Sequence, residues 1–286
     1  MKINLITQFY LDQNKDRNLE NLKCLKFNLE NKHINKIYIF LESNTKPDIL
    51  HKKLKLVKLG RRPTFHDFFM FTNRLVNNID IFIIANTDIY FDESISYSRR
   101  FLSKQNIFAL TRWDLLRDNS IVLYNKYLSQ DTWIFKSRIE KNIGNFFLGQ
   151  AGCDNRLLYE LKQTGFNIKN PCFSIKSVHV HMSKDRIYLD NPNYKFVETP
   201  YHYIFPNSFY SPFRTFLMKI FDQKNYKKFS FSFSDFYYIR FEYYLKMSKN
   251  ELQKMRIPLF KRIMAFAPRA YYYLLFQLFV KLKILK

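Results

Sequence analysis

The sequence is poor in glycine and cysteine and lacks any long apolar run. Five glycines in 286 residues exclude collagen-like and linker-rich architectures. The three cysteines, Cys24, Cys153 and Cys172, are too widely spaced for a disulfide framework or a zinc site, which favours a reducing compartment. No apolar run reaches the ~18 residues of a membrane-spanning helix, and the stretch after Lys2 is too short and polar for a signal peptide. We therefore expect a cytoplasmic protein.

Acidic residues are also scarce, at 24 against 47 lysines and arginines, which gives a formal charge of +23. A field of this sign favours partners that carry phosphate, such as nucleotides, nucleic acid or anionic lipid. The same composition is typical of an AT-rich genome, so the charge selects none of them. With 47% hydrophobic and 19% aromatic residues, the chain can build one large domain and a smaller appendage.

Apolar patterning predicts an alternation of strands and helices. Strands are expected at 3–9, 36–41, 54–59, 81–85, 107–111, 132–135 and 174–181, and helices at 17–29, 65–75 and 153–164. Thr64 is the expected N-cap of the second helix. This order predicts an α/β fold with a mostly parallel central sheet flanked by helices.

The best candidate for a site follows the apolar strand 81–85, which leads into Asn86-Thr87-Asp88, with Asp92 and Glu93 close behind. Open α/β sheets bind their ligands at the carboxyl ends of their strands. Oxygen ligands at that edge suit a hard divalent cation, Mg²⁺ or Mn²⁺, of the kind that a pyrophosphate needs. The alternative is an Asx turn followed by a solvated acidic loop.

Several segments together resemble the GT-A nucleotide-sugar glycosyltransferases, of the uncharacterised bacterial and capsule type. They are the Asp-x-Asp-like Asn86-Thr87-Asp88, the run 130–136, the run 147–156 from Phe-Leu-Gly-Gln to Asp-Asn-Arg, Asn170-Pro171, and His179-Val180-His181. The resemblance covers about 1–188. It implies a GT-A-like, Rossmann-type sheet, Mn²⁺ or Mg²⁺ as cofactor, and a nucleotide-sugar donor.

The resemblance also implies residue roles. Asp88 would hold the metal and the donor diphosphate. Asn86 stands where the family has its first acid, so less negative charge faces the cation, and it stays open whether Asp92 assists Asp88. His179 or His181 would be the last metal ligand, since residues two apart on a strand share a face. Surface histidines are the alternative. Asp154 would face the acceptor as general base, or simply cap its helix.

The remaining candidates lie around these. Asp131 is a second candidate catalytic carboxylate. Trp133 beside it is either a platform for the sugar or a core residue, and Trp113 is open to the same two interpretations. Arg112 and Asp114 are candidates for contact with the donor sugar. For the nucleotide, the candidates at the ends of the first two strands are Thr7, Gln8, Tyr10 and Glu42. Arg61 and Arg62 come just before the N-terminus of the second helix, where a guanidinium and the helix dipole could jointly meet phosphate; a solvated turn is the alternative.

Beyond Pro212 the composition changes, with 16 lysines and arginines against four acids from Arg214 onward. We expect a catalytic domain at 1–212 and a basic, aromatic, helical region at 213–286. Its apolar stretch 270–280, followed by Lys281, Lys283 and Lys286, is typical of an anchor to anionic lipid on the inner face of the plasma membrane. An ordinary packing subdomain is the alternative.

The predicted function is metal-dependent transfer of a sugar from a nucleotide sugar to a saccharide or lipid-linked glycan acceptor, in surface polysaccharide biosynthesis. Two alternatives stay open. One is a nucleotidyl- or phosphotransferase on a similar sheet, and the other is a non-catalytic basic protein that binds membrane or nucleic acid. Nucleic acid is not expected as a partner, because no recognised binding module is present.

Overall fold

The computed structural model describes residues 1–77, 79–124, 129–139, 142–180, 195–204, 206–210, 217–218, 221–222 and 224. The chain forms two compact units, Met1–Pro206 and Asn207–Lys286. All helices and strands with assigned bounds belong to the first unit. His181 and nearly all of 213–286, including the apolar stretch 270–280, lie outside the described residues, so the division at 212 stays a prediction.

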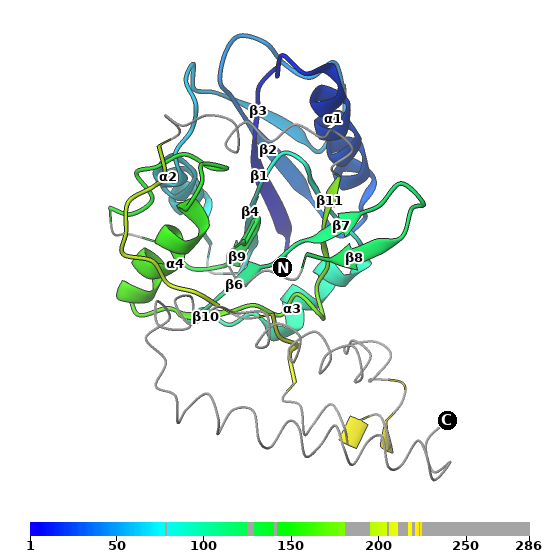
Figure 1. The fold of residues 1–286 in the computed structure, drawn as a ribbon, viewed down its shortest axis with the longest axis vertical. Helices are drawn as coiled ribbons and strands as arrows, with labels where there is room; N and C mark the ends of the chain where they lie inside the picture. Colours follow the sequence, from blue (N-terminus) through cyan, green and yellow to red (C-terminus); the bar gives the residue numbers. More distant parts are fainter. Residues whose placement is uncertain are drawn as a thin grey trace. The chain divides into compact units, whose positions relative to one another are not determined.

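A seven-stranded sheet forms the centre of the first unit, in the order β10-β6-β9-β4-β1-β2-β3 (Figure 1). Its strands, in that order, are Asn167–Lys169, Asn106–Leu110, Thr132–Phe135, Ile81–Ala85, Ile3–Phe9, Lys36–Leu41 and Leu54–Lys58. Neighbours pair in parallel except β9, which runs antiparallel to both β4 and β6. The predicted α/β class with a mostly parallel sheet is confirmed.

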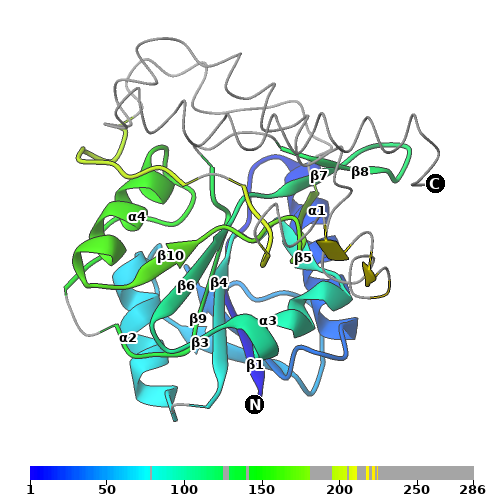
Figure 2. The ribbon, with the colours of Figure 1, turned by 90° about the horizontal axis from the view of Figure 1, so that it is seen from below.

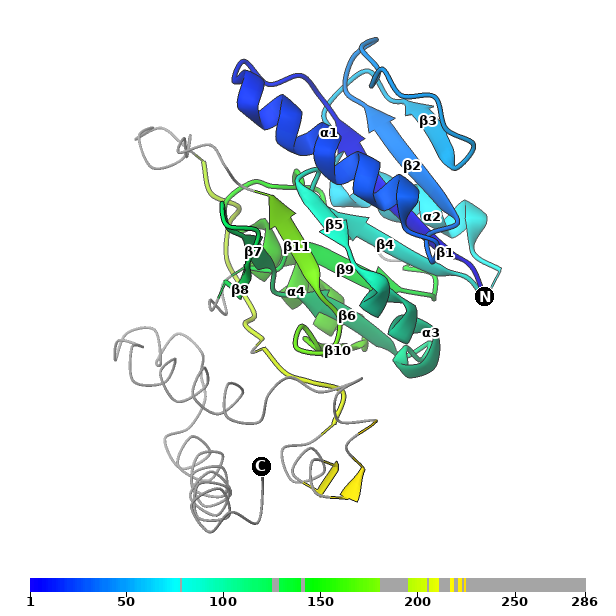
Figure 3. The same cartoon turned by 90° about the vertical axis from the view of Figure 1, so that its right-hand side faces the viewer.

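Helices cover both faces of the sheet. The helix α1 (Lys15–Glu30) and the short α3 (Ser98–Phe101) lie on one face, and α2 (Phe65–Leu75) and α4 (Cys153–Gln163) lie on the other (Figures 2 and 3). Thr64 caps α2 as predicted, in a capping box with Asp67. Among the described residues, no helix is long and apolar enough to cross a membrane.

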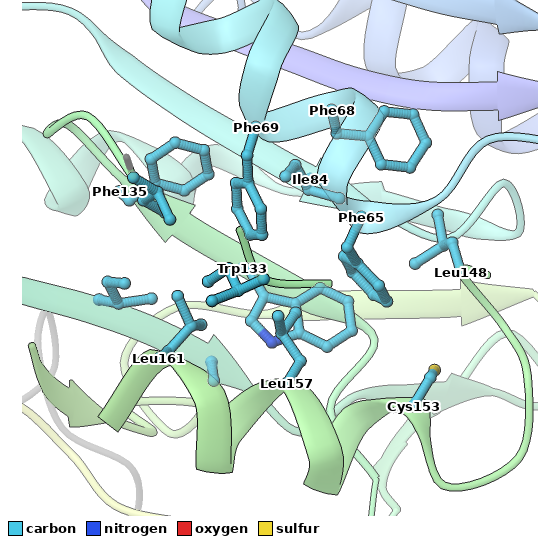
Figure 4. Packing of buried hydrophobic residues seen from close by; sticks show 14 of the residues in the cluster. Phe65, Phe68, Phe69, Ile84, Trp133, Phe135, Leu148, Cys153, Leu157 and Leu161 are labelled. Atoms are coloured by element: carbon cyan, nitrogen blue, oxygen red, sulfur yellow. The ribbon is translucent and has the colours of Figure 1, made fainter. Parts of the chain in front are cut away.

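One cluster of the core lies between the sheet and the helices α2 and α4. Trp133 on β9 is wholly buried there, with its ring centroid 4.7 Å from that of Phe65 (Figure 4). Phe69 packs on Phe135 in the same way, at 5.6 Å. The interpretation of Trp133 as a sugar platform is therefore wrong, because a side chain with no exposed surface cannot stack on a ligand. Its alternative, a core residue, is correct.

A second, four-stranded sheet adjoins the carboxyl edge of the first and was not predicted. Its order is β5-β11-β7-β8, with bounds Ile89–Phe91, Ser177–Val180, Trp113–Leu115 and Ile121–Leu123. The helix α1 holds its outer strand, since the amide of Asn28 donates to the carbonyl of Ile89 (2.8 Å) and accepts from the N–H of Phe91 (3.1 Å). Side-chain bonds thus satisfy backbone groups at the outer edge of β5, which has no strand partner on that side among the described residues. Figure 3 shows β5 and β11 side by side beneath α1.

Candidate active site

Strand pairing brings three of the predicted residues together at the carboxyl edge of β4. Residues Ala85 and Thr132 are partners in the β4–β9 register, so Asn86 and Asp131 follow as the next pair, with the N–H of Asn86 donating to the carbonyl of Asp131 (3.2 Å). The N–H of Asp131 in turn donates to Leu110, the last residue of β6 (3.2 Å). Arg112 is two residues further along that chain. Three strand ends therefore meet here.

The second sheet brings three more of the predicted residues together, namely Asp88, Asp114 and His179. The register pairs His179 on β11 with Asp114 on β7 on one side and with Ile89 on β5 on the other. Asp88 directly precedes β5, and its carbonyl accepts from the N–H of Val180 (3.0 Å). His179 consequently lies between two carboxylates, which neither residue spacing nor hydrophobic pattern specifies.

Hydrogen bonds join these six side chains into one chain, which we call the edge network. The amide of Asn86 donates to Asp131 (2.7 Å), and Arg112 donates to both Asp131 (3.3 Å) and Asp114 (3.0 Å). His179 bonds Asp114 through Nδ1 (2.9 Å) and Asp88 through Nε2 (3.2 Å). The network consists of Asn86, Asp131, Arg112, Asp114, His179 and Asp88.

Charges inside the edge network shift the pKa values of its members strongly. Burial acts to raise the pKa of Asp88, but the charge of His179, its hydrogen bond and the charge of Arg17 outweigh it and lower the pKa to about 2. Burial acts to lower the pKa of His179, but Asp88 and Asp114 raise it to about 9. In the absence of a ligand, His179 is therefore an imidazolium between two carboxylates at neutral pH.

The donor set at Asp88 and His179 fits a divalent cation. Among the described residues, Asp88 Oδ1 is buried without a hydrogen-bond partner, which is an open ligand position. Two ligands on adjacent positions of an octahedral ion, each at about 2.1 Å, lie about 3 Å apart, and Asp88 Oδ2 is 3.2 Å from His179 Nε2. Asp114 holds the other ring nitrogen, as second carboxylates do for metal-binding histidines.

Protein ligands alone do not complete such a site. Within the described ranges, no group of three His, Cys, Asp or Glu side chains is placed to hold a metal. Mg²⁺ and Mn²⁺ sites commonly fill their remaining positions with water and substrate phosphate. Asp92 does not contribute, because its carboxylate caps the 3₁₀ helix Glu93–Tyr97 through the N–H of Ser94 (2.9 Å). His181 is outside the described residues.

Sequence reasoning missed Arg17, in the first turn of α1. Its guanidinium lies 3.7 Å from Asp88 Oδ2 and 3.4 Å from Asp12. The signal that could have revealed it is electrostatic, since a cation in the first turn of a helix opposes the helix dipole. Another partner must favour an arginine there, and Asp88 is that partner.

Asp154 lies beside the network, in the first turn of α4. The N-cap of α4 is Gly152, with φ of 83°, and it makes no side-chain bond. Asp154 therefore does not cap this helix. It accepts instead from the N–H of Gln130 (3.3 Å) and from the thiol of Cys153 (3.2 Å). Burial and the charge of Asp131 raise its pKa well above the usual aspartate range, which suits a general base more than an ordinary carboxylate would.

The candidates for nucleotide binding are spread along the carboxyl edge. Thr7 donates to the carbonyl of Ala85 (2.9 Å). It also lines a cavity of about 20 Å³, the room of one water molecule, together with Gln8, Asn21 and Asn86. Among the described residues, Gln8 Oε1 and both amide atoms of Asn21 are buried without partners. This cavity can therefore hold a polar group.

The other nucleotide candidates lie farther along the edge. Arg62 donates to the carbonyl of Leu148 (2.7 Å) and packs on the ring of Phe147 (5.0 Å). Burial raises the pKa of Glu42, and the nearby charge of Arg62 opposes that shift. Tyr10 contributes a hydrogen bond that raises the pKa of Arg17. Arg61, by contrast, is bound to Asp67 through two bonds of 2.7 and 2.8 Å.

No family model matches the sequence, and no curated protein matches it. Solved structures do show likeness. A mannosyltransferase from Pyrobaculum calidifontis in complex with GDP-Man and Mn²⁺ is 12% identical, with a TM-score of 0.43, over 65% of this chain and 58% of that one. Residues 1–349 of TarS from S. aureus, with UDP-GlcNAc, are 9% identical (TM-score 0.39, 89% and 78%).

A cytidylyltransferase from Francisella tularensis, which acts on 2-C-methyl-D-erythritol 4-phosphate by its name, is 17% identical, with a TM-score of 0.36 over 63% of this chain and 90% of that one. All three TM-scores lie below 0.5, so these likenesses carry no argument about this chain. The chain spans little more than half of the mannosyltransferase. Likenesses this distant leave the function to the chain's own residues.

Proposed function

We propose that the chain transfers a sugar from a nucleotide-sugar donor to a saccharide or lipid-linked glycan acceptor, with Mn²⁺ or Mg²⁺ as cofactor, in surface polysaccharide biosynthesis. The observation that carries this proposal is the pair formed by Asp88 and His179. Asp88 Oδ1 is buried and, within the part of the chain that the structure describes, accepts no hydrogen bond, and His179 Nε2 lies 3.2 Å from the other oxygen of the same carboxylate. The pair sits at the carboxyl edge of an α/β sheet, where phosphorylated ligands bind.

Asp88 and His179 would hold the cation, which when bound neutralises the departing nucleoside diphosphate. Arg17 and Arg112, the resident cations beside Asp88, add positive potential for the same phosphates. During transfer the acceptor oxygen bonds to the anomeric carbon, and the bond from that carbon to the diphosphate oxygen breaks with its electron pair. Asp154 takes the proton of the acceptor hydroxyl.

The assay is hydrolysis and transfer across a panel of nucleotide sugars, with and without Mn²⁺. We expect Mn²⁺-dependent turnover of one donor, reduced at least 100-fold in Asp88→Asn. Asp118→Asn is the matched control, since that exposed carboxylate bonds only Ser120 in the described structure. Stabilisation by nucleoside triphosphates and by no nucleotide sugar would point to a nucleotidyltransferase. Turnover that Asp88→Asn leaves unchanged would refute the assignment.

The stereochemistry of the product tests the role of Asp154. A general base activates the acceptor for direct displacement, which inverts the anomeric configuration. Product NMR showing inversion, together with loss of turnover in Asp154→Asn, agrees with the proposed base. Retention would reduce Asp154 to a group that positions the substrate.

The basic region 213–286 would bring the enzyme to an anionic membrane surface, where a lipid-linked acceptor resides. The support is compositional, namely its 16 basic against four acidic residues and its aromatic content. Each lysine near such a surface contributes about 1 kcal/mol, so the triple variant K281Q/K283Q/K286Q should bind anionic liposomes roughly 100-fold more weakly. Binding equal to that of the unaltered chain would exclude the anchor.

A further inference from the structure

Asn86 stands where the resembled motif has an acid, and its contacts give this difference a physical reason. Its Nδ2 donates to Asp131 Oδ1 at 2.7 Å. The side chain of Asp131 is 5% exposed and also accepts from Ser129 (3.2 Å) and Arg112 (3.3 Å). The NH₂ end of the amide faces Asp131, which accepts from all three of these donors.

Backbone pairing fixes the approach of these two side chains. Residues 85 and 132 are register partners, and the N–H of Asn86 bonds the carbonyl of Asp131. An aspartate at position 86 would therefore set a half-buried carboxylate against the buried carboxylate of Asp131, where like charges repel. The carboxylate of Asp131 therefore favours an amide, and disfavours a second acid, at position 86.

We propose that Asn86 is a positioning residue that anchors the edge network by holding the carboxylate of Asp131. Asn86 orients Asp131, Asp131 orients Arg112, and Arg112 holds Asp114 against the imidazole of His179. The expected effect of Asn86 on Mn²⁺ affinity rests on the proposed function. Its expected effect on the stability of the fold does not.

A double-mutant cycle with Asn86→Asp, Asp131→Asn and the exchange of both tests this inference. Asn86→Asp should lower the melting temperature by about 4 to 10 °C, because a buried and a half-buried carboxylate then face each other with no donor between them. The exchange places an amide opposite an acid again, in reversed order, and should recover at least half of that loss. Mn²⁺ affinity, measured by EPR titration, should fall roughly tenfold in Asn86→Asp and recover in the exchange.

Opposite results would overturn the inference. An asparagine that is merely a weakened metal ligand predicts that Asn86→Asp binds Mn²⁺ more tightly at an unchanged melting temperature. An exchange variant no more stable than Asn86→Asp, or one that fails to fold, would equally contradict the pairing. If the unaltered chain binds no Mn²⁺, the proposed function fails, and the melting temperatures still decide the role of Asn86.

Discussion

Replacement of Asp114 by asparagine isolates the charge that acts on His179. Asp114 Oδ1 accepts from His179 Nδ1 at 2.9 Å and from Arg112 Nε at 3.0 Å. The amide oxygen of asparagine can accept the same two bonds, so the geometry is kept and only the negative charge is lost. That charge favours the imidazole form with its proton on Nδ1, which leaves Nε2 facing Asp88 and a cation.

Loss of such a second carboxylate typically weakens metal binding 10- to 100-fold, or about 1.4 to 2.7 kcal/mol. We expect a loss in this range for Asp114→Asn when Mn²⁺ is titrated and the free ion is followed by EPR. Asp118→Asn removes one negative charge from an exposed turn only four residues away and should change the affinity less than twofold. A Kd for Asp114→Asn equal to that of this control would refute the positioning of His179 by Asp114.

Three further predictions follow from the same contacts. Asp154→Asn should lower kcat by roughly 10²- to 10⁴-fold. In the unaltered chain, the acid limb of the rate–pH profile should lie above the usual aspartate range because the pKa of Asp154 is raised. An acid limb near pH 4 would contradict this. The stability that His179⁺ contributes is fully present below pH 6.5 and is lost as pH rises through about 9. In urea unfolding, His179→Gln should therefore be about 3 kcal/mol less stable than the unaltered chain at pH 6. Above pH 9 the two should have nearly equal stability. Trp133→Ala should lose about 3 to 5 kcal/mol of unfolding free energy, measured in the same way, and a loss below 1 kcal/mol would remove Trp133 from the core.

Much of the central sheet follows from local sequence pattern. The strand β4 is a continuous apolar run, β1 is mostly apolar, and the alternation in β3 marks it as an outer strand, so their bounds are found within one residue. The second sheet was missed because β5, β7 and β8 have three residues each. Runs that short carry no usable periodicity, and only long-range pairing makes them strands.

The candidate site divides in the same way. Asp88 and His179 were candidates because their residue types and positions at strand ends pointed to them, and the structure places them in contact. The partnership of Asp114 with His179 depends on the β7–β11 register, which a single sequence does not reveal. The sequence left Trp133 open between a sugar platform and a core residue, because an aromatic residue beside an acid has the same pattern whether it faces a ligand or the core.

The central claim is that one divalent cation binds between Asp88 and His179. Anomalous diffraction from crystals of the unaltered chain grown with Mn²⁺ and a nucleoside diphosphate tests it most directly. We predict a peak about 2.0 to 2.6 Å from a carboxylate oxygen of Asp88 and from His179 Nε2, with diphosphate oxygens on the ion. A manganese peak elsewhere, or a bound nucleotide with no peak at this position, would contradict the claim.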